Sequence, residues 1–134
     1  MGGRGYKNDV TGYLLGNRRT VEFEAEYKSE DGLIDILRDK MSRKSPTLPI
    51  FSNTEGKIYA LIGKRGDIKS IGYYDETHRL TKSIHLDHYD NHLKWHVHEG
   101  DAYHHLHRNA RDLTSDELEM VNRILNIWDK QRGK

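Results

Sequence analysis

Three short runs of strand-forming residues constrain the fold of this chain most. They cover Lys57–Ile62, Ile68–Tyr74 and Leu80–Leu86, and isoleucine and tyrosine recur in them. The connections between them are brief: a glycine-bounded turn at 63–67 and a polar turn at 75–78. Connections this short join antiparallel neighbours, so the sequence predicts an antiparallel β-meander.

A strand and a helix are predicted before the meander. Between residues 21 and 28, apolar side chains alternate with three glutamates and a lysine, which indicates a half-buried strand with one acidic face. Ser29 can then cap a helix, and Pro46 disfavours a helical conformation at Ser45. The apolar stripe of this helix would consist of Leu33, Ile34, Leu37 and Met41. We therefore expect a helix from Ser29 to about Ser45.

The end of the chain carries the clearest helical pattern. Thr114 and Glu117 have the spacing of a capping box, and an apolar stripe follows from Leu118 to Trp128. The expected fold is α+β: an antiparallel β-meander with an N-terminal strand-helix unit and a C-terminal helix packed on the sheet. The glycine-rich start suggests a flexible arm over residues 1–19, which leaves 20–134 as a single domain.

Composition narrows the class of protein. The chain has 134 residues, no cysteine and a formal net charge of +1. Disulfides and thiolate metal sites are therefore excluded, and no global basic field exists to drive nonspecific nucleic-acid binding. No apolar run approaches the ~20 residues that a membrane span requires. We expect a cytoplasmic protein without a membrane partner, and we predict no cofactor, with zinc as the alternative.

Histidine is concentrated in one stretch of the chain. Eight of the nine histidines lie between residues 85 and 107. They are His85, His88, His92, His96, His98, His104, His105 and His107. Imidazole can donate or accept a proton and can bind a metal near neutral pH. A long segment without periodicity, here 87–112, is often functional inside a compact domain.

Acid–base chemistry is the first interpretation of this stretch. If 96–98 is extended, His96 and His98 share one face and Val97 is buried behind them. One imidazole could remove a proton from an attacking 2′-hydroxyl while another protonates the leaving oxygen. We predict Asp87, His88, His96 and His98 as catalytic residues of metal-free RNA cleavage. Arg108 is the predicted cationic support, and Lys94 and Arg111 are further candidates.

Three other interpretations stay open. His96 and His98 could bind zinc and leave one position for a water molecule. The third ligand would be His88, Asp87 or one of His104, His105 and His107. Clustered imidazoles could form a binding surface that becomes charged as the pH falls. The histidines could also be ordinary loop residues, or core residues whose hydrogen bonds are satisfied.

Several motifs carry a resemblance. They are MGGRG at the start, IKSIGYYDETHRLTKSIHLDH, WHVHEG and LTSDELEMVNRILNIW. With them the chain resembles small proteins encoded in phages and prophages of Gram-positive bacteria, near head-assembly genes. Its middle part is similar to C-terminal modules of polymorphic toxins, some of which belong with metal-independent RNases such as barnase, colicin and RelE-type proteins.

The resemblance implies two functions. One is an RNase-like, toxin-type domain with RNA as its partner, for which Asp87, His88, His96 and His98 are the positions to carry over. The other is a non-catalytic phage accessory protein that binds a head component or a host factor. The location implied is the host cytoplasm or the virion.

Overall fold

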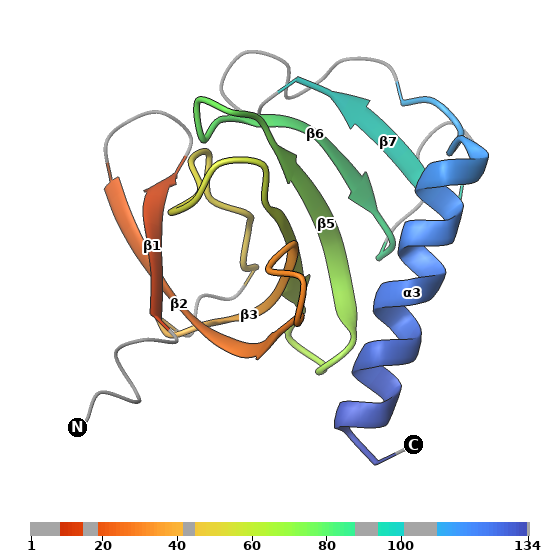
Figure 1. The fold of residues 1–134 in the computed structure, drawn as a ribbon, viewed down its shortest axis with the longest axis horizontal. Coiled ribbons are helices and arrows are strands. Elements are labelled where there is room, and N and C mark those ends of the chain that lie inside the picture. The colour runs from red at the N-terminus through yellow and green to blue at the C-terminus, as the bar shows by residue number, and fades with distance from the viewer. Residues whose placement is uncertain (1–8, 15–18, 42–44, 88–93, 101–109, 134) are drawn as a thin grey trace.

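Seven strands form one sheet in the part of the chain that the structure describes (Figure 1). The structure is a computed structural model, and it describes residues 9–14, 19–41, 45–87, 94–100 and 110–133. The strands are β1 (Asp9–Leu14), β2 (Arg19–Lys28), β3 (Ile34–Asp39), β4 (Ile58–Ile62), β5 (Ile68–Tyr74), β6 (Leu80–His85) and β7 (His96–Glu99). The helix α3 (Ser115–Gln131) follows them.

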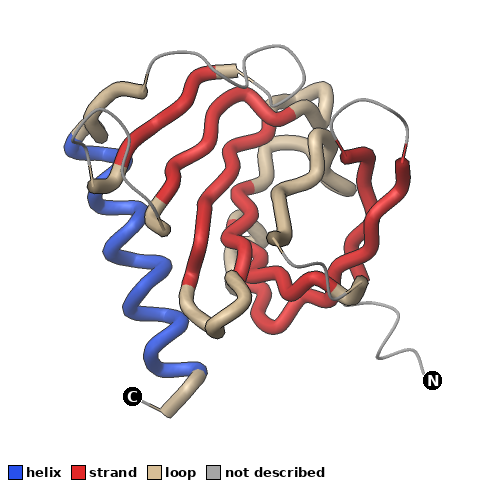
Figure 2. Tube along the Cα trace, turned by 180° about the vertical axis from the view of Figure 1, so that it is seen from behind, coloured by secondary structure: helices blue, strands red, loops and turns tan. Residues whose placement is uncertain are grey.

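The strands lie in the sheet in the order of the sequence. All neighbours are antiparallel except β3 and β4, which are parallel. Figures 1 and 2 show that the sheet is strongly curved, with the segment before β4 inside the curl and α3 against the outer side. Because β3 and β4 are parallel, the chain must return from the end of β3 to the opposite end of the sheet before β4 begins. The segment 40–57 makes this connection.

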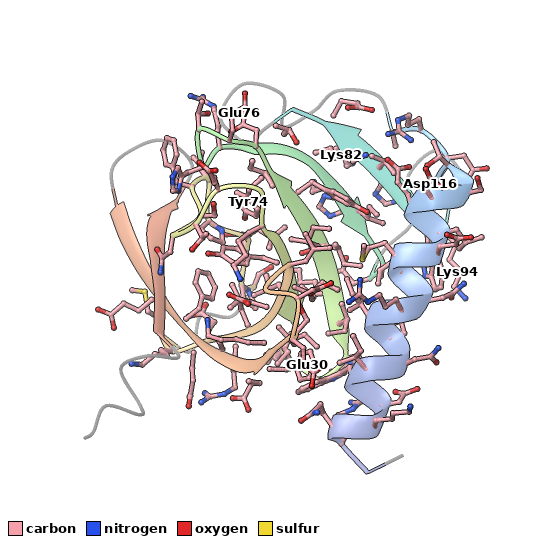
Figure 3. All side chains as sticks on the ribbon, in the orientation of Figure 1. Glu30, Tyr74, Glu76, Lys82, Lys94 and Asp116 are labelled. Carbon is pink, nitrogen blue, oxygen red and sulfur yellow. The ribbon has the colours of Figure 1, made fainter. Side chains whose placement is uncertain are left out.

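Each face of the sheet has its own apolar core. Inside the curl lie Phe23, Ala25, Leu37, Leu48, Tyr59, Leu61, Tyr74 and Leu80. The core between the sheet and α3 consists of Ile34, Ile36, Ile58, Ala60, Ile62, Ile68, Ile71, Ile84 and Val97 from the sheet side and Val121 and Ile124 from α3. Figure 3 shows Tyr74 inside the curl, where its hydroxyl donates to the carbonyl of Pro49 at 2.6 Å. Burial raises the pKa of this phenol well above its ordinary value.

The α+β class is confirmed, and so are the meander and the C-terminal helix. The three predicted runs correspond to β4, β5 and β6. The capping box is present at the start of α3: the backbone N–H of Glu117 donates to Thr114 Oγ1, and the N–H of Thr114 donates to Glu117 Oε1. None of the helices in the described part of the chain is both long and apolar enough to cross a membrane.

The predicted helix from Ser29 to Ser45 is wrong, because β3 occupies the middle of that segment. Ser29 does accept a backbone N–H, but the donor is Ile34 across a tight turn in which Gly32 has a φ of 75°. Strands on both sides pair with β3, and only Arg38 in it is exposed. Burial on both faces favours a strand over the helical stripe that the spacing suggests.

The start of the chain also differs from the expectation of a flexible arm over 1–19. Residues Asp9–Leu14 form β1 and pair with β2, so this part of the segment belongs to the sheet. Residues 1–8 and 15–18 lie outside the described residues. The sheet therefore begins before Thr20.

Gly72 marks a close approach inside the curl. A Cβ at this position would lie 2.9 Å from the side chains of both Leu48 and Leu80, and 3.1 Å from that of Tyr74. We expect Gly72→Ala to lower the free energy of unfolding by about 1–3 kcal/mol, because the added methyl overpacks this core. Urea unfolding measures the change. The double variant Gly72→Ala/Leu48→Ala should lose less stability than the sum of the two single losses, because the shorter side chain at 48 leaves room for the added methyl. Strictly additive losses would contradict this packing.

Candidate functional site

Pairing of β6 with β7 brings three histidines together. The antiparallel register places His85 opposite His96 and Ser83 opposite His98. Ile84 and Val97, between them in the sequence, belong to the core under α3. Because side chains alternate along a strand, the three imidazoles lie on the other face of the sheet. We call His85, His96 and His98 the histidine cluster.

The three rings of the histidine cluster are in mutual contact. His85 and His96 are stacked, with centroids 5.4 Å apart and planes at 7°. His98 meets both rings edge-on, at 5.0 Å from His85 and 5.1 Å from His96. The predicted placement of His96 and His98 on one face, with Val97 buried behind them, is confirmed.

Burial separates the roles that the three rings can take. His96 is 0% exposed, whereas His85 and His98 are half-buried. A nitrogen of the His85 ring, Nε2, lies 3.0 Å from Ser83 Oγ in a hydrogen bond whose direction depends on the tautomer. Part of the surface of His85 and of His98 is therefore accessible, whereas His96 can act only through its neighbours.

Of the other predicted catalytic residues, the described part of the chain contains only Asp87. Asp87 is exposed beyond the end of β6. His88 and Arg108 lie outside the described residues, as do the four histidines at 92, 104, 105 and 107. His85 was not among the predicted catalytic residues. Alternation along β6 indicates its face, but its contact with His96 depends on the pairing of β6 with β7.

Arg111, one of the predicted cations, is engaged elsewhere. Its guanidinium donates to both carboxylate oxygens of Glu117, at 2.9 and 2.8 Å, and its Nε donates to Glu99 at 2.8 Å. The hydrogen bonds to Glu117 and then to Glu99 raise the pKa of Arg111 above its ordinary value. Since Glu117 belongs to α3, Arg111 binds on the side of the sheet that α3 covers.

Sequence reasoning missed the polar centre that these residues form. Lys82 Nζ donates to Glu117 Oε2 at 2.7 Å, and Figure 3 shows Lys82 extending from β6 toward the start of α3. Glu117 is only 3% exposed. Hydrogen bonds from Arg111, and then from Lys82, hold the pKa of Glu117 well below its ordinary value. The sequence feature that indicates this polar centre is Lys82, a charged residue among the apolar side chains of the strand Leu80–Leu86.

The zinc alternative finds no complete site among the described residues. No group of three His, Asp or Glu side chains in that part of the chain is arranged to hold a metal ion. Zinc requires ligand nitrogens about 2.0–2.1 Å from one point, whereas the rings of His85 and His96 lie parallel, one on the other. Of the predicted third ligands, His88 and the histidines at 104, 105 and 107 lie outside the described residues.

Comparisons with protein-family models, with curated proteins and with solved structures find no match. The resemblance to phage proteins and toxin modules therefore stays a prediction. What the chain can do chemically follows from the residues of the histidine cluster and from their surroundings.

Proposed function

We propose that this chain is a small RNase-like domain that cleaves RNA by acid–base chemistry at the histidine cluster. One observation carries the proposal: three imidazoles from two paired strands touch one another at centroid separations of 5.0–5.4 Å. Such a group can remove a proton from a 2′-hydroxyl and supply one to the leaving 5′-oxygen. The 2′-oxygen forms a bond to phosphorus, the bond between phosphorus and the 5′-oxygen breaks, and the leaving 5′-oxygen takes up the supplied proton.

Contact between the rings supports the division of labour that this reaction needs. The reaction needs one group as base at the 2′-oxygen and a second group as acid at the 5′-oxygen of the same phosphodiester. Rings whose centroids lie 5.0–5.4 Å apart place two imidazoles close enough to act on one phosphodiester.

Exposure assigns the roles within the histidine cluster. His98 and His85 are half-buried and are the proposed catalytic pair. His96 is fully buried and stacks on His85, so we assign it as a positioning residue. Ser83 holds the His85 ring from the same strand. Cationic support from Arg108 and participation of His88 and Asp87 remain predictions.

We expect His98→Ala to reduce RNA cleavage by about 100-fold or more, which is the usual loss when a positioned acid or base is removed. His78→Asn is the matched control, because it also removes an imidazole but lies in the turn at the other end of β6, where asparagine tolerates the φ of 72°. The measurement is cleavage of a fluorescent RNA by both variants and the unchanged protein. Equal cleavage by all three would contradict the assigned role of His98.

A further inference from the structure

A cavity lies beside the end of β6. Its volume is about 480 Å³, which is within the range of ligand sites. The turn between β4 and β5 forms one wall, Ser45 and Pro46 a second, and Leu86 and Asp87 a third. Three segments that are distant in the sequence therefore line it.

The walls of this cavity are rich in cations. Lys64 and Arg65 are exposed at the β4–β5 turn, and Lys69 follows on β5. Lys69 Nζ donates to the carbonyl of Pro46 at 2.5 Å and to Ser45 Oγ at 3.0 Å, which ties two walls together. Of the two acids in the lining, Asp67 forms an ion pair with Arg132 at 3.2 Å, and Asp87 is the other.

The turn that carries these cations is held in place. The N–H of Gly63 donates to the carbonyl of Asp67 at 2.7 Å. Trp128 Nε1 of α3 donates to the carbonyl of Gly66 at 2.8 Å, and Arg132 donates to the same oxygen at 2.9 Å. Lys64 and Arg65 therefore extend from an anchored backbone, which lowers the entropy lost when they bind an anion.

The cavity adjoins the histidine cluster along the chain. Leu86 and Asp87 line the cavity and directly follow His85. Two residues of extended chain span at most about 7 Å. A strand of RNA lying across the end of β6 could thus contact both places.

We infer that this cavity binds a backbone phosphate of the RNA strand that the histidine cluster cleaves, with Lys64 and Arg65 as its principal contacts. This inference rests on the proposed function. Two adjacent cations on one turn suit a phosphate group, because lysine and arginine form charge-assisted hydrogen bonds with its oxygens. Neutralising the phosphates of a nucleic acid also releases the counterions bound to them. The same chemistry would accept free phosphate, so the test must separate the two sources.

The test measures binding of a short fluorescent 2′-O-methyl RNA, which cannot be cleaved, by anisotropy at several salt concentrations. Lys64→Ala/Arg65→Ala should raise Kd about 10-fold and should reduce the slope of log K against log salt by about 1.4, or 0.7 for each lost contact. Arg123→Ala/Lys130→Ala removes the same charge from α3, where both residues are exposed, and should change neither quantity. Inorganic phosphate is titrated as a competitor.

Equal losses in the two double variants, or no loss in the first, would overturn the inference. The inference would also be overturned if inorganic phosphate displaced the RNA at a phosphate concentration equal to the Kd of the RNA. That result would identify a site for free phosphate. Binding that depends on Lys64 and Arg65 without any cleavage would support the phosphate site while contradicting the RNase proposal. Cleavage that depends on His98 alongside unchanged binding would overturn only the phosphate site.

Discussion

Replacing Glu117 by alanine is expected to lower the free energy of unfolding by about 3–5 kcal/mol, the range for breaking a buried ion pair from one side. The carboxylate is 3% exposed and receives hydrogen bonds from Arg111, Lys82 and the N–H of Thr114. Its loss leaves two cations without this partner and removes half of the capping box. Urea unfolding, followed by circular dichroism, measures the change.

The control for Glu117 is Glu119→Ala, an exposed glutamate on the same helix, which should change stability by less than about 0.5 kcal/mol. Acid adds a second test. Because the folded-state pKa of Glu117 is depressed below 4.5, its contribution is present above about pH 4.5 and is lost as the pH falls toward the folded-state pKa. Below pH 4.5 the unchanged protein should therefore lose stability more steeply than Glu117→Gln. Parallel pH curves would contradict the role of this carboxylate.

A second large loss of stability, about 3 kcal/mol, is expected from Asp35→Asn. Asp35 is 1% exposed on β3, and its two oxygens receive Lys57 Nζ at 3.0 Å and Lys28 Nζ at 3.2 Å. The Lys57 side chain is itself only 11% exposed, so it cannot turn fully to water when the carboxylate is neutralised. Unfolding in urea again reports the loss.

The stability lost on replacing each lysine partner of Asp35 should depend on how buried that lysine is. Lys28→Ala should cost less than about 1 kcal/mol, because the Lys28 side chain is 40% exposed and its ion pair is screened. The double variant Asp35→Asn/Lys57→Met should be more stable than Asp35→Asn alone, because it removes the cation that loses its carboxylate partner in the single substitution. A double variant less stable than either single variant would contradict this assignment.

Local patterns were sufficient for most of the fold. The β4–β6 meander and α3 follow from short turns, apolar spacing and the capping box, each of which acts within a few residues. The sequence around β3 predicts a helix, because Ser29, Leu33 and Leu37 also fit a capped amphipathic helix. Its strand conformation comes from pairing with both β2 and β4, and the parallel partner lies across the long crossing 40–57. Such non-local pairing overrides propensity and is not visible in a short window.

The candidate site divides in the same way. Alternation was enough to place His96 and His98 on one face with Val97 behind them. The contact of His85 with His96 required the register between β6 and β7, and the connection between those strands has no periodic pattern that fixes a register. Glu117 was recognised as a capping residue, but its ion pairs with Arg111 and Lys82 depend on how α3 lies across the sheet.

Dependence of cleavage on the 2′-hydroxyl tests the proposed chemistry most directly. The purified protein is incubated with an RNA oligonucleotide, and with copies in which single riboses are replaced by 2′-deoxyribose, in buffer with and without chelator. If the histidine cluster transfers the protons, we expect cleavage that stops at each substituted position, leaves a 2′,3′-cyclic phosphate and survives chelator. Cleavage that continues at the deoxy positions, or the absence of any cleavage of RNA, would contradict the proposed function.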